Sequence, residues 1–326
     1  MTNKHPLVFS LELNPRWIVM SALAIAPGIT YAIWQQSALW LVAPFLAMCG
    51  ILPYGGSYRT IWLALLNVVV ICSLAFLVKH LILLHSLPSM LIFIVCLALV
   101  AGFVDSAEAQ LKSFSSWLII GSIYGGEHLV AYSLGESDVL KLILLAFAGI
   151  ILATIFRLQG SIRLEPKLPR VHEPEFIFCF KYLLPMLCTT LLWFKLDLHE
   201  AQWLVWSSLS VVFLEIEALY LRFQQRSLAV ILGCSSGLLV SHFLPVSEFI
   251  TYLSLILLLL SLRGFKDYFP AYFLRCFLVV IYAGNHSLAI AYERFSNVIL
   301  GGLIGFICTY CLIKVYEFLA ARVQKL

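Results

Sequence analysis

Long apolar runs, separated by short polar breaks, follow one another along almost the whole sequence. A helix of about 20 apolar residues crosses the roughly 30 Å of hydrocarbon in a bilayer, and a spanning backbone must satisfy its own hydrogen bonds. Hydrophobic residues make up 62% of the chain and charged residues only 12%, which excludes an ordinary aqueous globular fold. The sequence predicts an all-α polytopic membrane protein with about 12 transmembrane helices, at 17–34, 38–53, 60–84, 88–104, 116–133, 140–156, 181–197, 201–221, 227–244, 248–262, 272–291 and 297–316.

The distribution of positive charge predicts how these helices are oriented. Of the 21 Lys and Arg residues, all but Lys79, Lys141, Lys195 and Arg294 lie in segments that are cytoplasmic if the N-terminus is inside. Lys and Arg are retained on the cytoplasmic side of membranes. We therefore expect both termini in the cytoplasm and an even number of crossings.

A polar, proline-containing stretch near the middle of the chain predicts a division into two modules. It reads "RLQGSIRLEPKLPRVHEPE" and interrupts the apolar runs, with six before it and six after it. An even number of crossings means that both halves enter the membrane in the same direction. We expect two parallel repeats: a six-helix module at 1–156, a basic cytoplasmic linker at 157–180 and a second six-helix module at 181–326.

A short motif that occurs in both halves predicts a substrate site. "YGGEH" begins at residue 124 and "YAGNH" begins 158 positions later, and "WLVA" and "WLVW" recur with a similar offset, at Trp40 and Trp203. Tyr and His four residues apart share one helix face, and both motifs fall on the fifth predicted helix of a half. We expect them to face one central cavity at mid-membrane. The candidate substrate-binding residues are Tyr124, His128, Tyr282, Asn285 and His286.

Ionisable side chains within the apolar runs suggest coupling to protons. Such groups are costly inside a membrane and usually face a cavity or a partner. Histidine titrates near physiological pH, and Glu127 in the first motif is replaced by Asn285 in the second. The candidate proton-coupling residues are Glu127, Glu215 and Glu217.

Glu215 and Glu217 precede Arg222 and Arg226 by five to eleven residues, and this cluster allows two interpretations. In the first, an ion-pair network fixes a helical hairpin at the cytoplasmic surface. In the second, the two arginines collect an anionic substrate, because a guanidinium fork can bind both oxygens of a carboxylate. Both interpretations remain open at the level of sequence.

The second half resembles a known family through its tryptophan, arginine and glycine positions. It contains "QWLVWSSLSVVFLEIEALYLRFQQRSLAVILGCSSGLLVSHF" and, further on, "ERFSNVILGGLIG". Over residues 180–320 this pattern resembles the fusaric acid resistance family of bacterial inner-membrane proteins, which includes aromatic acid exporters. The positions that carry the resemblance are Trp203, Arg222, Arg226, Gly233, Gly237, Arg294, Gly301 and Gly305.

The glycines of this pattern also predict close packing between helices, because glycines four apart give a helix a flat face. "GCSSG" at 233–237 fits the Gly-x-Ser-x-Gly motif of serine hydrolases, but that motif needs a strand-to-helix turn and here lies in an apolar helix. "CTYC" at 308–311 has no second pair of ligands, and the sequence holds no phosphate-binding or dinucleotide motif. We expect no enzyme, no metal, no cofactor and no nucleic-acid partner.

The resemblance implies a multi-pass secondary transporter of the bacterial inner (plasma) membrane that exports aromatic or other organic acids or toxic compounds. The ionisable residues of the apolar runs make protons the expected coupling ion. Its expected partners are the lipid bilayer, a small organic anion or aromatic substrate, and a second copy of the chain or a periplasmic adaptor subunit. One alternative is a major facilitator-like transporter, although the loop signature of that superfamily is replaced here by "YGGSYR". Another is an organic-anion channel or a non-transporting membrane assembly protein.

Overall fold

The computed structural model describes residues 12–54, 61–107, 114–158, 180–198, 200–244 and 247–323. These residues form helices joined by short turns, and within them extended pairing is limited to an isolated bridge between Leu13 and Phe265. The expectation of an all-α protein is confirmed. Most of the linker expected at 157–180 lies outside the described residues.

The described helices fall into two groups on either side of that linker. The first half contains α1 (Pro15–Trp34), the 3-10 helix η1 (Ala38–Leu41), α2 (Val42–Tyr54), α3 (Ile61–Leu83), α4 (Leu87–Ala107), α5 (Phe114–Ala131) and α6 (Glu136–Leu158). The second half contains α8 (Leu183–Leu196), α9 (Ala201–Ser210), α10 (Ile216–Ser241), α11 (Glu248–Leu260), α12 (Tyr268–Tyr282), the 3-10 helix η4 (Gly284–His286) and α13 (Ser287–Val323). Five helices, α1, α3, α4, α6 and α13, are long and apolar enough to cross a membrane.

The starts of two helices follow from the polar residue that caps each of them. Asn14 precedes α1, and its side chain accepts a hydrogen bond from the backbone N–H of Trp17 (3.5 Å). Pro15 then takes the first helical position, where a backbone N–H would have no partner in the helix. Ser247 caps α11 in the same way by accepting from the N–H of Ile250 (3.3 Å). Both helices begin within two residues of the predicted positions, 17 and 248.

The predicted boundary between the second and third helices of the second half is wrong. The helix expected at 201–221 ends at Ser210 as α9, and α10 starts at Ile216 instead of residue 227. Arg222 and Arg226 therefore lie inside α10 and not in a hairpin. A charged residue can remain within an apolar helix when side chains of neighbouring helices hydrogen-bond to it, as they do here.

The predicted helix at 272–291 is also too long, because α12 ends at Tyr282. Gly284 follows with φ of 54°, in the left-handed region that favours glycine. The short helix η4 then turns the chain into α13, which runs for 37 residues. Asn285 and His286 consequently lie in a turn between two helices and not on a continuous helix.

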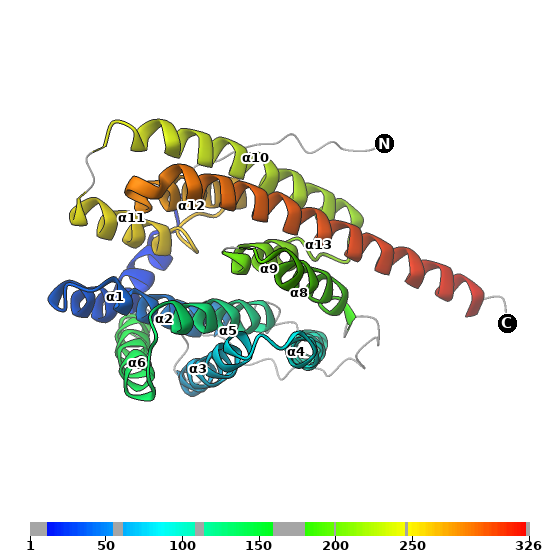
Figure 1. Ribbon diagram of the computed structural model, residues 1–326, viewed down its shortest axis with the longest axis horizontal. Coiled ribbons are helices and arrows are strands. Elements are labelled where there is room, and N and C mark those ends of the chain that lie inside the picture. Colours follow the sequence, from blue (N-terminus) through cyan, green and yellow to red (C-terminus); the bar gives the residue numbers. More distant parts are fainter. Residues whose placement is uncertain are drawn as a thin grey trace.

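Each half packs as a bundle, and the bundles meet along one face (Figure 1). In the first half α3 packs on α5 and α1 on α6, and in the second half α10 packs on α12 and α9 on α13. Contacts between the halves join α4 to α8, α1 to α11 and α5 to α9. The largest cluster of buried apolar side chains contains residues of both halves, so the halves share one core.

Four glycines lie where helices of the second half approach most closely, namely Gly233, Gly237, Gly301 and Gly305. A Cβ on Gly233 would lie 2.7 Å from the carbonyl oxygen of Phe273 in α12, and a Cβ on Gly301 would meet the carbonyl oxygen of Leu204 in α9. A larger side chain at these positions would separate the helices. The glycines thus allow α9, α10, α12 and α13 to pack closely. These helices carry most of the site described next.

Candidate substrate-binding site

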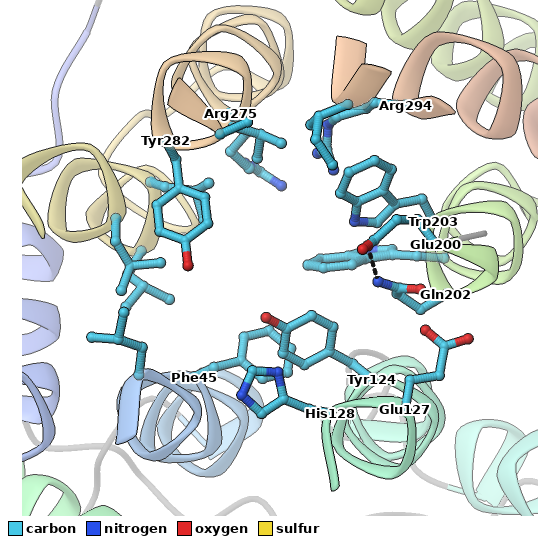
Figure 2. Close-up of a pocket in the computed structure, with 18 of the residues that line it drawn as sticks. Phe45, Tyr124, Glu127, His128, Glu200, Gln202, Trp203, Arg275, Tyr282 and Arg294 are labelled. Atoms are coloured by element: carbon cyan, nitrogen blue, oxygen red, sulfur yellow. Dashed lines mark hydrogen bonds between the residues drawn. The ribbon is translucent and has the colours of Figure 1, made fainter. Parts of the chain in front are cut away.

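A cavity of about 710 Å³ lies between the two halves (Figure 2). Residues of α2 and α5 line it from the first half, and residues of α9 to α13 line it from the second. Tyr124 and Tyr282 point into it from opposite sides. A cavity of this size is sufficient for a small organic molecule.

Aromatic rings form one side of the cavity. Phe45 of α2 packs against Tyr124 of α5, with ring centroids 4.7 Å apart, and against Trp206 of α9 at 6.1 Å. Trp206 also contacts Trp117 edge-on at 5.9 Å. Because these rings come from both halves, they fix the halves relative to one another. They also offer an apolar surface to a planar ligand.

Arginines of three different helices form another side, and they are Arg226 of α10, Arg275 of α12 and Arg294 of α13. Only 3% of Arg226 is exposed; its Nε donates to Ser207 Oγ (2.9 Å) and its Nη1 to the hydroxyl of Tyr268 (2.7 Å). The guanidinium of Arg294 lies over the ring of Trp203, 4.7 Å from its centroid. None of the three arginines forms a salt bridge with a carboxylate of the described residues. This side of the cavity therefore favours an anion.

Carboxylate and amide oxygens lie on a further side (Figure 2). Glu127 extends from α5, while Glu200 and Gln202 lie at the start of α9. The side-chain amide of Gln202 donates a hydrogen bond to the carboxylate of Glu200. The backbone carbonyl of Glu200 accepts a hydrogen bond from Asn297 of α13 (3.2 Å). These bonds fix the acidic side relative to the helix that carries Arg294.

Several buried polar atoms around the cavity have no hydrogen-bond partner among the described residues. They are Nε2 of His128, Oε1 of Gln202, the hydroxyl of Tyr272 and Nε of Arg294. Buried polar atoms in proteins are nearly always paired. Donors and acceptors of this kind around one cavity indicate a polar ligand.

Six residues singled out from the sequence line this one cavity, although they come from distant parts of the chain: Tyr124, Glu127, His128, Arg226, Tyr282 and His286. The ring of His128 stacks on that of Tyr124, with centroids 5.9 Å apart, and is half-buried. His286 is exposed. Their participation in substrate binding stays a prediction.

The other predicted residues lie elsewhere. The guanidinium of Arg222 stacks on Tyr268, 3.8 Å from the ring centroid, and does not line the cavity. Glu215 and Glu217 are exposed at the start of α10, where negative charge suits the helix dipole. Within the described residues they form no salt bridge with the arginines of α10, so the ion-pair network of the first interpretation is not formed there. The side chain of Asn285 lies outside the described part.

Sequence reasoning missed Arg275, Glu200 and Gln202 as cavity residues. Arg275 interrupts the apolar run "YFLRCFLVV", and an arginine in such a run is a signal for a functional position. Arg226 and Arg275 were both expected among the positive charges of cytoplasmic segments, and the structure places them inside α10 and α12, where they line the cavity. Glu200 and Gln202 occupy a short junction between helices that carries no recognisable motif.

The second half of the chain matches a known family. Residues 187–308 fit the family model described as fusaric acid resistance protein-like. This segment is similar to the fusaric acid resistance protein-like family. It extends from α8 into α13 and contains all three cavity arginines. A domain of this family indicates a function in membrane transport or resistance. No curated protein and no solved structure matches the chain.

The segment that matches this family thus supplies the basic side of the cavity, and the first half supplies Glu127 and part of the aromatic side. Ser235, in the hydrolase-like motif "GCSSG", lies within α10 and not at a strand-to-helix turn. Among the described residues, no group of three His, Cys, Asp or Glu side chains is placed to hold a metal ion. The arrangement favours reversible binding of a charged, planar molecule.

Proposed function

We propose that this protein is a secondary transporter of the bacterial inner membrane that exports aromatic or other organic acids. The observation that carries the proposal is that Arg226, Arg275 and Arg294 line one cavity beside aromatic rings, without a salt bridge to a described carboxylate. Buried positive charge is costly unless it is paired. The carboxylate of a ligand would pair with it through two hydrogen bonds, and the aromatic rings would contact the plane of the ligand.

The pattern of helix contacts supports two parallel repeats with twelve crossings. In each half the third helix packs on the fifth, the second on the sixth and the fourth on the fifth. The fourth helix of each half also packs on the first helix of the other half, as α4 does on α8 and α11 on α1. A twofold axis along the membrane normal would produce this pattern. We propose that both termini are cytoplasmic and that the shorter helices cross beside the polar cavity.

We also propose that Glu127 couples transport to the movement of protons. Carboxylates inside membrane proteins commonly serve as proton carriers, and Glu127 lines the same cavity as the arginines. Glu215 and Glu217 are exposed at the start of α10 and do not line the cavity, so the proposal assigns this role to Glu127 alone. We retain a periplasmic adaptor subunit or a second copy of the chain as the proposed protein partner.

Flux measurements in proteoliposomes test the proposal. The purified protein is reconstituted, and movement of labelled 4-methylbenzoate is followed. Arg294→Gln should lower the flux about tenfold or more, since it removes a charged hydrogen-bond donor from the cavity. Arg222→Gln removes the same charge outside the cavity and should keep most of the flux. No flux with the unaltered protein, or equal losses in both variants, would contradict the proposal.

A further inference from the structure

The cavity carries opposite charges on separate sides (Figure 2). Arg275 and Arg294 extend into it from one side, and the carboxylates of Glu127 and Glu200 lie on another. No salt bridge joins Arg275 or Arg294 to Glu127 in the part of the chain that the structure describes. The two sides can therefore engage different groups of one ligand.

The acidic side is arranged to accept hydrogen bonds. Gln202 uses its amide group to donate to Glu200, which leaves its Oε1 as a buried acceptor without a partner among the described residues. The carboxylate of Glu127 lies beside this amide (Figure 2). An ammonium group has three N–H donors and a positive charge. It would match these oxygens better than a hydroxyl or an apolar group does.

The basic side is arranged to donate hydrogen bonds. Nε of Arg294 and the hydroxyl of Tyr272 have no partner among the described residues, and these side chains are 7% and 2% exposed. A carboxylate can accept from a guanidinium and a neighbouring hydroxyl at the same time. Trp203, on which Arg294 stacks, lies between the basic and the acidic sides in Figure 2 and offers a flat apolar surface.

We propose that the preferred substrates are zwitterionic aromatic acids, with a carboxylate at one end of the ring and a primary ammonium at the other. The carboxylate would bind at Arg294 and Arg275, the ammonium at Glu127, and the ring against Trp203. This inference rests on the proposed function and narrows its substrate class. Because Glu127 belongs to the first half, the segment that matches the family, residues 187–308, lacks part of the ammonium site.

Binding of a matched set of ligands to the full-length purified protein tests the inference. The set is 4-(aminomethyl)benzoate, which has both charges, 4-methylbenzoate, which has only the carboxylate, and 4-methylbenzylamine, which has only the ammonium. Isothermal titration should show that the first binds on the order of tenfold or more tightly than either of the others. Glu127→Gln should remove most of this advantage. Glu215→Gln, a matched loss of an exposed carboxylate, should preserve it.

The outcomes separate this inference from the proposed function. If 4-methylbenzoate binds as tightly as 4-(aminomethyl)benzoate, the inference is wrong and organic-acid transport stands. If neither acid binds, both are wrong. If Glu127→Gln alters the pH dependence of flux and leaves the ratio of the two affinities unchanged, Glu127 carries a proton and not the ammonium. The comparison of the three ligands on the unaltered protein decides the matter even if a variant fails to fold.

Discussion

The same five-residue motif has a different local structure in each half of the molecule. In the first half it lies on the continuous helix α5. There the ring of His128 stacks on that of Tyr124, with centroids 5.9 Å apart, and meets the ring of Tyr132 at a tilt, with centroids 4.4 Å apart. In the second half Tyr282 ends α12, and His286 lies exposed in the turn that follows. Both copies reach the same cavity, but only the first does so from a single continuous helix.

The halves also supply different charges to that cavity. All of its arginines come from the second half, and the lining residues of the first half include Glu127 but no Lys or Arg. The shared motif therefore does not determine what each half contributes. Under the proposed function, the arginines of the second half bind an anion, and Glu127, at the position where the two motifs differ, binds a cation or a proton.

The largest effect is expected from breaking the helix packing of either half. Alanine at Gly301 would place its Cβ against a backbone carbonyl of α9, and alanine at Gly149 would do the same against α1. Overpacking of this kind costs about 1–3 kcal/mol or more. We expect each variant to melt at a clearly lower temperature in detergent. Gly302→Ala, whose Cβ would lie 3.4 Å from the ring of Phe223, is the control and should melt normally. Tolerance of Gly149→Ala alone would mean that the halves differ in packing as well as in charge.

The next largest effect is a difference in ligand affinity between variants of the two motif histidines, His128 and His286. His128 has a buried Nε2 without a described partner, whereas His286 is exposed. His128→Ala should weaken 4-methylbenzoate binding about tenfold and His286→Ala about twofold at most, because a hydrogen bond in a buried site contributes more. Dissociation constants from isothermal titration check this. Equal losses would show that the turn presents its histidine as effectively as the helix does.

A smaller effect concerns the residue that differs between the motifs. Glu127 can titrate and Asn285 cannot, and the other ionisable lining residues nearby, His128 and Glu200, remain in both variants. Glu127→Gln should reduce the change in flux between about pH 5 and 8 to roughly twofold or less, and Asn285→Ala should retain the full change. The measurement is initial flux of 4-methylbenzoate at each pH. A normal pH profile in Glu127→Gln would assign coupling to another group.

The smallest effect is expected at an outer link between the halves. Lys266 donates to Glu12 over 2.6 Å, both side chains are 59% exposed, and this bond raises the pKa of Lys266. Exposed ion pairs add little stability. The raised pKa stabilises the fold below the ordinary lysine value of about 10.4, and this contribution is lost as pH rises through the folded value. Glu12→Gln should leave the melting temperature at pH 7 almost unchanged, because backbone hydrogen bonds such as Asn14 N–H to Gly264 O (2.7 Å) maintain the link. A large decrease in melting temperature would show that the ion pair stabilises the link between the halves.

Apolar length predicted most helix boundaries because it is a local property of the sequence. The helix expected at 60–84 is α3, and its observed bounds differ by one residue at each end. The break after Ser210 was not predictable in this way. It depends on Arg226 staying inside α10, where it bonds to Ser207 and Tyr268, 19 and 42 positions away in the sequence.

The repeated motif predicted part of the cavity for a similar reason. A periodicity of four residues places Tyr124 and His128 on one helix face whatever the rest of the fold does. Arg275 and Glu200 were missed because their position in the site arises only where α12 and the start of α9 meet the first half. Residue spacing within the sequence does not predict these contacts between the halves.

The long helix α13 packs closely against α9 near its middle, and its last turns lie apart from the other helices (Figure 1). Its 37 residues make it roughly 55 Å long, and its last turns extend away from the bundle (Figure 1). Gly305 packs against the backbone of Ser208 in α9, and Arg294 lies on the cavity side of this contact. If α13 tilts about this contact as a rigid helix when a ligand binds, each point moves in proportion to its distance from Gly305. The distance to Arg294 is about 16 Å and the distance to the far end about 27 Å. A substrate that displaces Arg294 would then displace the far end of α13 further than it displaces the cavity wall. A spin label on the last turn would detect this displacement.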